Sequence, residues 1–222
     1  MIKVHHLADS RSQRVLWLLE ELGLDYEIIR YERDPKTMLA PAALRAVHPL
    51  GKSPVIEDGA VVVAETGAVV EYLLDTYDVE NRLRPARGTQ AGRQFSYWHH
   101  YAEGSAMPPL LLKLVFSQLP RRAPGLVRPL VRSIASKANA GFIGPQIKTH
   151  IDWQEKSLSS SGWFAGDSFS AADIMMSFPL EAAASRAIAR ADYPHIDRFL
   201  STIHARPAWI KALSRGGEYA YA

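Results

Sequence analysis

The chain of 222 residues contains no cysteine. This absence excludes disulfides, thiolate metal sites and any enzyme that uses a thiol of its own. No apolar run approaches the roughly 20 residues of a membrane-spanning helix, and the first residues lack the apolar region of a signal peptide. We therefore expect a cytoplasmic protein. Several histidines form adjacent pairs, without the i, i+4 spacing of a helical zinc site, so we expect no metal.

Acidic residues are absent from a long stretch of the second half. No aspartate or glutamate lies between Glu103 and Asp152, whereas residues 1–87 carry 14 acidic and 11 basic groups. A basic surface attracts nucleic acid, anionic lipid or an anionic ligand. Because no nucleic-acid-binding motif accompanies these cations, we expect a solvated helix face and no nucleic-acid partner.

Part of this basic stretch has the apolar spacing of an amphipathic helix. Val127, Leu130, Val131 and Ile134 recur at helical intervals within residues 121–138. Such a stripe is typical of a helix that packs on a bundle, and a basic amphipathic helix can also dock on an anionic membrane surface. We expect burial in the bundle rather than peripheral membrane contact.

The first half alternates between strand and helix patterns. Gly23 is expected to end the first helix as its C-cap, and Asp58-Gly59 predicts a hairpin turn. The predicted elements are strands at 2–7, 26–31, 53–57 and 60–64 and helices at 15–22, 41–46 and 66–77. The resulting order, β-α-β-α-β-β-α, indicates an α/β domain.

The second half has helical patterns almost throughout. Pro85 and Gly88 mark a linker, and proline and glycine recur at the later breaks. The predicted helices span residues 89–118, 125–138, 141–160, 171–187 and 195–213. We therefore predict two domains: an α/β domain over residues 1–82 and an all-α helical bundle over residues 88–222.

Three groups of polar residues stand at the ends of the predicted elements. Ser10 lies in the turn before the first helix, where backbone N–H groups and the helix dipole favour an anion. A cis bond at Ser53-Pro54, at the start of a strand, would present backbone groups to a peptide-like ligand. Thr66 can cap the next helix and bind a carboxylate, while Glu65 can hold an ammonium group. Each group alone also has an ordinary structural explanation, as an N-cap or a strand start.

Together the three groups resemble the thioredoxin-like domain of cytosolic glutathione transferases of the serine type. The matching stretches are residues 10–17, 48–55 and 65–70. The resemblance implies that Ser10 stabilises the glutathione thiolate and that Ser53-Pro54 pairs with the cysteinyl backbone. It also implies that Glu65-Thr66 holds the γ-glutamyl end and that Lys52 faces the glycyl carboxylate.

The second half agrees with this resemblance. Residues 166–174 resemble the family's buried capping motif, in which Ser170 and Asp173 form a capping box before an apolar helix. The resemblance extends from residue 2 to about residue 213. It implies a thioredoxin-like domain followed by a helical bundle, a homodimer, and glutathione as co-substrate.

Three residues of the first turn compete for the role of thiolate stabiliser. Counting back from Arg14, as serine-type members are arranged, favours Ser10. Ser12 lies on the same turn, and Arg11 could contribute its charge instead. The turn contains no tyrosine, so a tyrosine-type mechanism is not expected.

The implied chemistry is ionisation of a thiol that arrives with the substrate. A free thiol has a pKa of about 8.5, and a hydroxyl hydrogen bond at a helix N-terminus lowers it. The thiolate would attack an electrophilic carbon, or a peroxide oxygen, in an apolar cleft. We predict a glutathione transferase that acts in detoxification and has a glutathione peroxidase side activity. The alternative is a non-enzymatic glutathione-binding or protein-interaction module of the same fold.

The sequence does not identify the electrophile. We expect its site between the two domains, along the helix that begins near residue 89. The candidate lining residues are Tyr97, Trp98, Tyr101, Met107, Leu111 and Phe116. For most of them, the bundle core or a dimer interface is the favoured location.

Overall fold

The computed structural model describes residues 1–37 and 39–221. Its N-terminal half is built on a four-stranded sheet in the order β2-β1-β3-β4. The strands are β1 (Ile2–Leu7), β2 (Tyr26–Tyr31), β3 (Val55–Asp58) and β4 (Val61–Ala64). Strand β1 pairs in parallel with β2, and the other neighbours are antiparallel. The pairing of Asp58 with Val61 closes the β3–β4 hairpin, which confirms the predicted turn.

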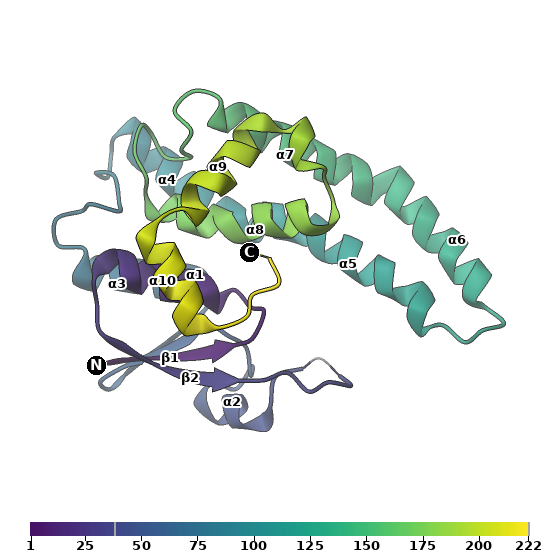
Figure 1. Ribbon diagram of the computed structural model, residues 1–222, viewed down its shortest axis with the longest axis horizontal. Helices are drawn as coiled ribbons and strands as arrows, with labels where there is room; N and C mark the ends of the chain where they lie inside the picture. Colours follow the sequence, from purple (N-terminus) through teal and green to yellow (C-terminus); the bar gives the residue numbers. More distant parts are fainter. Residues whose placement is uncertain (38, 222) are drawn as a thin grey trace.

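Helices cover both faces of this sheet. They are α1 (Ser12–Leu22), α2 (Ala42–Val47) and α3 (Thr66–Tyr77). Figure 1 shows α1 and α3 between the sheet and the remaining helices, with α2 on the opposite side. Gly23 ends α1 in the left-handed conformation, with φ of 68°, as its glycine predicts. The predicted βαβαββα order is confirmed.

The C-terminal half consists of helices. Its elements are α4 (Gln90–Tyr101), the π-helical turn η1 (Ala102–Ala106), α5 (Met107–Arg122), α6 (Arg128–Ala138), the π-helical turn η2 (Asn139–Ile143), α7 (Gly144–Leu158), α8 (Ala171–Arg186), the 3-10 turn η3 (Arg190–Asp192), α9 (Pro194–His204) and α10 (Pro207–Gly216). The single helix predicted at 195–213 is two helices. Pro207 lacks the N–H of a continuing helix, and Arg206 before it is extended, with ψ of 133°. The division into domains 1–82 and 88–222 stays a prediction.

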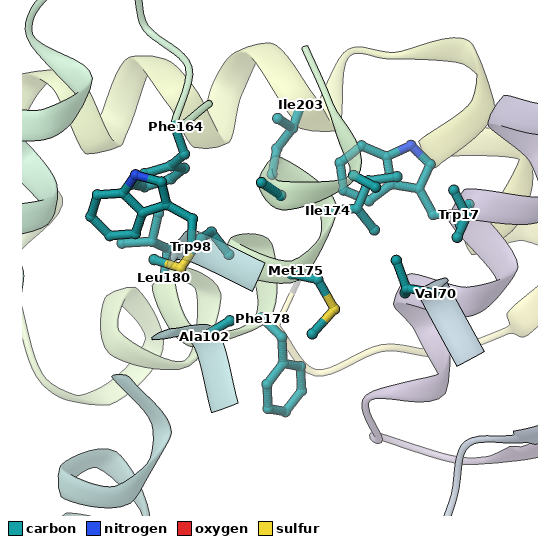
Figure 2. Packing of buried hydrophobic residues seen from close by; sticks show 14 of the residues in the cluster. Trp17, Val70, Trp98, Ala102, Phe164, Ile174, Met175, Phe178, Leu180 and Ile203 are labelled. Atoms are coloured by element: carbon teal, nitrogen blue, oxygen red, sulfur yellow. The ribbon is translucent and has the colours of Figure 1, made fainter. Parts of the chain in front are cut away.

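Helix α8 is the centre of the helical half. Residues 171–183 are all buried, because α8 packs against α1, α4 and α9. In Figure 2, Trp17 of α1 lies beside Ile174, and Trp98 of α4 lies beside Leu180. One hydrophobic cluster therefore joins both halves and fixes the turn before α1 relative to α5 and α8.

The predicted capping box fixes the start of α8. The Ala172 N–H donates to Ser170 Oγ at 3.3 Å, and the Ser170 N–H donates to Asp173 Oδ2 at 2.8 Å. The Phe164 N–H donates to Asp173 Oδ1 at 2.9 Å. One buried carboxylate thus holds both the helix start and the loop before it.

Helices α5 and α6 form an arm, residues 107–138, that extends beyond the other helices (Figure 1). The two helices pack on each other. In α6, however, Leu130 and Ile134 are 63% and 55% exposed, and Leu126 at the tip is 96% exposed. The prediction that the apolar stripe of α6 is buried in the bundle of its own chain is therefore wrong. Helical periodicity indicates that a helix has an apolar face, but it does not indicate what covers that face. Within the described residues, no helix is long and apolar enough to cross a membrane.

Candidate functional site

Two adjoining pockets lie where the sheet meets the helical half. The polar pocket has a volume of about 250 Å³ and is lined by Arg11, His48, Leu50, Lys52, Ser53, Pro54, Ala64, Glu65 and Thr66. The apolar pocket has a volume of about 360 Å³ and is lined by the first turn, α5, α8 and Tyr221. Arg11, Lys52 and Ser53 line both pockets, so the two are neighbours that share these wall residues. The five residues predicted to bind glutathione all line the polar pocket.

Ser53 and Pro54 form the wall of the polar pocket at the start of β3. The bond between them is cis. The Ser53 hydroxyl donates to the His5 carbonyl at 2.7 Å and accepts from the Leu7 N–H at 3.3 Å. The Ser53 side chain is thus attached to β1, which fixes the position of the loop and of its main chain beside the pocket.

Glu65 and Thr66 form the wall at the start of α3. The cap position belongs to Glu65, and Thr66 is the first helical residue, so the predicted capping by Thr66 is wrong. Glu65 has φ of 74° and makes no side-chain cap hydrogen bond. A non-glycine residue adopts this conformation only at a cost of about 1–3 kcal/mol. Glu65 lines the pocket beside the N-terminus of α3. A cationic group of a ligand can therefore pair with the carboxylate, and an anionic group next to it can bind at the helix N-terminus.

The three candidate thiolate stabilisers occupy different positions. Ser10 lines the apolar pocket, and Arg11 lines both pockets. Ser12 is fully buried behind Ser10, and the two hydroxyl oxygens are 2.7 Å apart. The Ser12 N–H also donates to Ser10 Oγ at 3.2 Å. Of the two serines, Ser10 is therefore the one that borders a pocket.

Arg11 belongs to a partly buried network of charges between the two halves. Its Nε lies 3.3 Å from Glu103 Oε2, and Glu103 also binds the buried guanidinium of Arg14. Arg14 donates to the carbonyl of Met175 in α8 at 2.7 Å. Burial lowers the pKa of Arg11, although Glu103 opposes this. Burial raises the pKa of Glu103, but Arg14 and Arg11 outweigh burial and lower it.

Helices α5 and α8 supply the apolar wall. Met107, Leu110, Leu111 and Leu114 come from α5, and Phe178 comes from α8. Of the six residues expected to line this site, Met107 and Leu111 do so. Tyr97 and Trp98 line another pocket, of about 770 Å³, between α4 and α7. Tyr101 is buried, and Phe116 packs against the core.

Sequence reasoning missed the contributions of α8 and of the chain end. Phe178, Arg186 and Tyr221 all line the apolar pocket, and Arg186 lies 5.0 Å from the centre of the Tyr221 ring. These residues reach the site through long-range packing, for which no local pattern in the sequence gives a signal. Within the described part of the chain, no three histidine or acidic side chains are grouped to hold a metal ion.

Comparison with models of protein families gives two matches. Residues 10–76 match the model of the glutathione S-transferase N-terminal domain, and residues 143–207 match that of the C-terminal domain. The first match contains both walls of the polar pocket. The second contains the capping box and all of α8.

Relatives of known name extend these matches to nearly the whole chain. Glutathione S-transferase 1 of Saccharomyces cerevisiae is 35% identical over 94% of this chain and 92% of its own length. Glutathione S-transferase 3 of Schizosaccharomyces pombe is 33% identical over 94% and 85%, respectively. The crystal structure of a glutathione S-transferase from Actinobacillus pleuropneumoniae, 36% identical, covers 100% of this chain and 95% of its own, with a TM-score of 0.82. A sphingomonad glutathione S-transferase complexed with glutathione shares the fold at 24% identity, with a TM-score of 0.73 and coverage of 97% and 98%.

Proposed function

The chain belongs to the glutathione S-transferase family and is a glutathione transferase, and on this premise we propose how its two pockets divide the reaction. The polar pocket binds glutathione, and the apolar pocket binds the electrophile. The observation that carries this proposal is that the two pockets adjoin and share Arg11, Lys52 and Ser53 as wall residues. A peptide in the first pocket can thereby extend its central side chain into the second.

The proposed orientation of glutathione follows the charges of the polar pocket. The ammonium group of the γ-glutamyl residue pairs with the carboxylate of Glu65. The α-carboxylate of the same γ-glutamyl residue accepts hydrogen bonds from the N–H groups and the hydroxyl at Thr66. The cysteinyl main chain pairs with Ser53 beside Pro54, and the glycyl carboxylate faces the ammonium of Lys52. With these ends fixed, the sulfur lies at the junction of the pockets, next to Ser10.

The proposed chemistry is ionisation of the thiol followed by nucleophilic attack. The Ser10 hydroxyl donates a hydrogen bond to the sulfur, and the N-terminus of α1 and the Arg11 guanidinium add positive potential. These groups hold the thiol pKa below its ordinary value of about 8.5. The thiolate attacks an electrophilic carbon and the new carbon–sulfur bond forms as the leaving group departs. A hydroperoxide in the same pocket would be attacked at its terminal oxygen as a side activity. The O–O bond breaks, the alcohol leaves, and a second glutathione converts the resulting sulfenic acid to the disulfide and water.

We also propose a homodimer, which would cover the exposed face of the arm. Eight exposed large apolar side chains of the described residues lie in the arm, at 107–138, a concentration typical of an interaction surface. The arm carries no acidic residue, whereas residues 1–87 carry net charge −3. The arm of one copy is thus complementary in charge to the α/β half of a second copy. A cytoplasmic location and a role in detoxification belong to the same proposal.

Crystals soaked with glutathione, together with an activity panel of aryl halides, epoxides and hydroperoxides, test the proposal. We expect electron density for glutathione in the polar pocket, with its sulfur beside Ser10, and turnover of at least one electrophile class. Glutathione found elsewhere would overturn the assignment of the pockets. Glutathione in place with no turnover across the panel would favour the non-enzymatic alternative.

A further inference from the structure

A chain of hydrogen bonds leads from Ser10 into the interior of the α/β half. Ser10 Oγ lies 2.7 Å from Ser12 Oγ, and Ser12 Oγ lies 2.8 Å from Nδ1 of His6 on β1. All three side chains are buried, and Ser12 is fully so. Neither Ser12 nor His6 lines the two pockets. These residues can therefore influence a bound sulfur only through Ser10.

His6 is held in its neutral form. Burial and the charge of Arg30 lower the pKa of His6 to about 4, although the main chain of Gly216 and the carboxylate of Asp9 oppose this. At neutral pH the imidazole therefore has one N–H and one free lone pair. Which ring nitrogen carries the hydrogen decides whether the hydroxyl groups of Ser12 and Ser10 donate towards His6 or away from it.

The two tautomers of His6 leave Ser10 in different states. With the hydrogen on Nε2, Ser12 donates to Nδ1 of His6, and Ser10 must donate inward to Ser12. With the hydrogen on Nδ1, His6 donates to Ser12 and Ser12 donates to Ser10 Oγ. The Ser10 hydrogen is then free to point into the apolar pocket, while its oxygen accepts from both the hydroxyl and the N–H of Ser12.

A thiolate at the junction of the pockets needs the arrangement in which Nδ1 of His6 carries the hydrogen and Ser10 donates outward. An anion accepts hydrogen bonds and donates none, so it favours the state in which Ser10 donates outward. In that state each hydroxyl of the chain is both donor and acceptor, and a donor that itself accepts is polarised and strengthened. This arrangement costs the hydrogen bond from His6 to the Gly216 carbonyl, which then keeps only Arg30 as its donor, so the bound thiolate must supply the free energy for it.

We propose that Ser12 and His6 are positioning residues that direct the Ser10 hydrogen towards the glutathione sulfur and so lower the pKa of the bound thiol. This inference rests on the proposed function, because it assumes that the sulfur lies beside Ser10. It assigns the two serines of the turn to different roles: Ser10 contacts the sulfur, and Ser12 orients Ser10. His6 sets the direction of the chain.

The test measures the pKa of bound glutathione from the ultraviolet absorbance of its thiolate and from the pH profile of kcat/KM. We expect Ser12→Ala and His6→Leu each to raise this pKa by about half a unit, which lowers kcat/KM about threefold at pH values below the pKa. The rate at high pH and the affinity for glutathione should change little. His6→Asn, whose amide can donate from a position close to Nδ1, should restore most of the loss.

His5→Leu is the matched control. His5 is as buried as its neighbour, but it faces away from Ser12 and instead contacts the Tyr31 hydroxyl and Glu57, each at 2.9 Å. Its removal disturbs β1 but leaves the hydrogen bonds between His6, Ser12 and Ser10 in place, so the pKa of the bound thiol should stay unchanged. Ser12→Ala should likewise have no further effect on the pKa in a Ser10→Ala background, because Ser12 acts through Ser10.

The outcomes separate this inference from the proposed function. If Ser10→Ala raises the thiol pKa while Ser12→Ala and His6→Leu leave it unchanged or lower it, the inference is overturned and the proposed function stands. A lowered pKa in Ser12→Ala would mean that Ser12 holds the Ser10 hydrogen away from the sulfur. If Ser10→Ala itself leaves the pKa unchanged, the sulfur does not depend on Ser10. This inference and the proposed role of Ser10 then both fail, while the assignment of the pockets is tested separately by the glutathione soak.

Discussion

Glu103 is the counter-ion of a buried arginine, and Glu103→Gln removes its charge with little change in shape. Arg14 is 2% exposed and binds Glu103 of η1 and the carbonyl of Met175 in α8. Removing one partner of a buried ion pair costs about 3–5 kcal/mol of stability, because the remaining charge stays buried without compensation. Glu103 is 29% exposed, so water solvates one side of the pair. We therefore expect a loss of about 2–3 kcal/mol in the free energy of unfolding, at or just below the low end of that range.

Urea unfolding at neutral pH and fixed protein concentration measures this loss, provided that the m-value is unchanged. Glu71→Gln is the matched control, because the Glu71 carboxylate lies 3.7 Å from His99 and is 51% exposed. We expect that control to lose less than about 0.5 kcal/mol. If Glu103→Gln unfolds at the same urea concentration as the control, the pair does not stabilise the contact between the two halves, and the reasoning is refuted.

The same pair predicts how the difference depends on pH. In the folded chain the pKa of Glu103 lies below its ordinary value of 4.5, since Arg14 and Arg11 outweigh burial. A lowered pKa gives stability that is present above the ordinary value and is lost as pH falls through the folded value. The difference in the free energy of unfolding between the wild type and Glu103→Gln should therefore be largest at neutral pH and decrease as the pH falls. A difference that is constant down to low pH contradicts the charge argument.

Three further predictions concern the cap, the polar pocket and the arm. Asp173→Ala leaves the buried N–H groups of Phe164 and Ser170 without acceptors, at about 1–3 kcal/mol each; urea unfolding should detect the loss. Glu65→Gln should raise KM for glutathione about tenfold without lowering kcat, and a fall in kcat at constant KM would contradict its role in binding. Leu130→Glu should convert dimer to monomer by light scattering, whereas Ile210→Glu, equally apolar and 53% exposed on α10, should not; a monomeric wild type would refute the dimer.

The sequence was sufficient to predict the wall residues of the polar pocket. Ser53 and Glu65 each stand at the end of a regular element, and turn and capping residues mark such ends in the sequence. In the sheet order β2-β1-β3-β4, these ends meet at one edge. Turn and capping patterns marked these positions, and the resemblance to glutathione transferases, rather than the patterns alone, predicted that they would share a pocket.

Contacts between distant elements could not be predicted in this way. The bond between Ser12 and His6, and the network of Arg14 with Glu103, join residues whose proximity depends on packing. The exposed stripe of α6 is a similar case, because an apolar face has the same periodicity whether a bundle or a second chain covers it. The break before Pro207, in contrast, was visible in the sequence, since the residue before a proline disfavours helix.

The central claim is that the Ser10 hydroxyl lowers the pKa of the bound glutathione thiol. Its most direct test is a titration of thiolate absorbance in the complexes of the wild type and of Ser10→Ala. The control is Ser157→Ala on α7, which lines neither of the two pockets. We expect the wild type and the control to hold the pKa below the ordinary thiol value of about 8.5. Ser10→Ala should return it towards that value, while the dissociation constant of glutathione measured at pH values below the thiol pKa hardly changes. The same lowered pKa in all three proteins would contradict the claim.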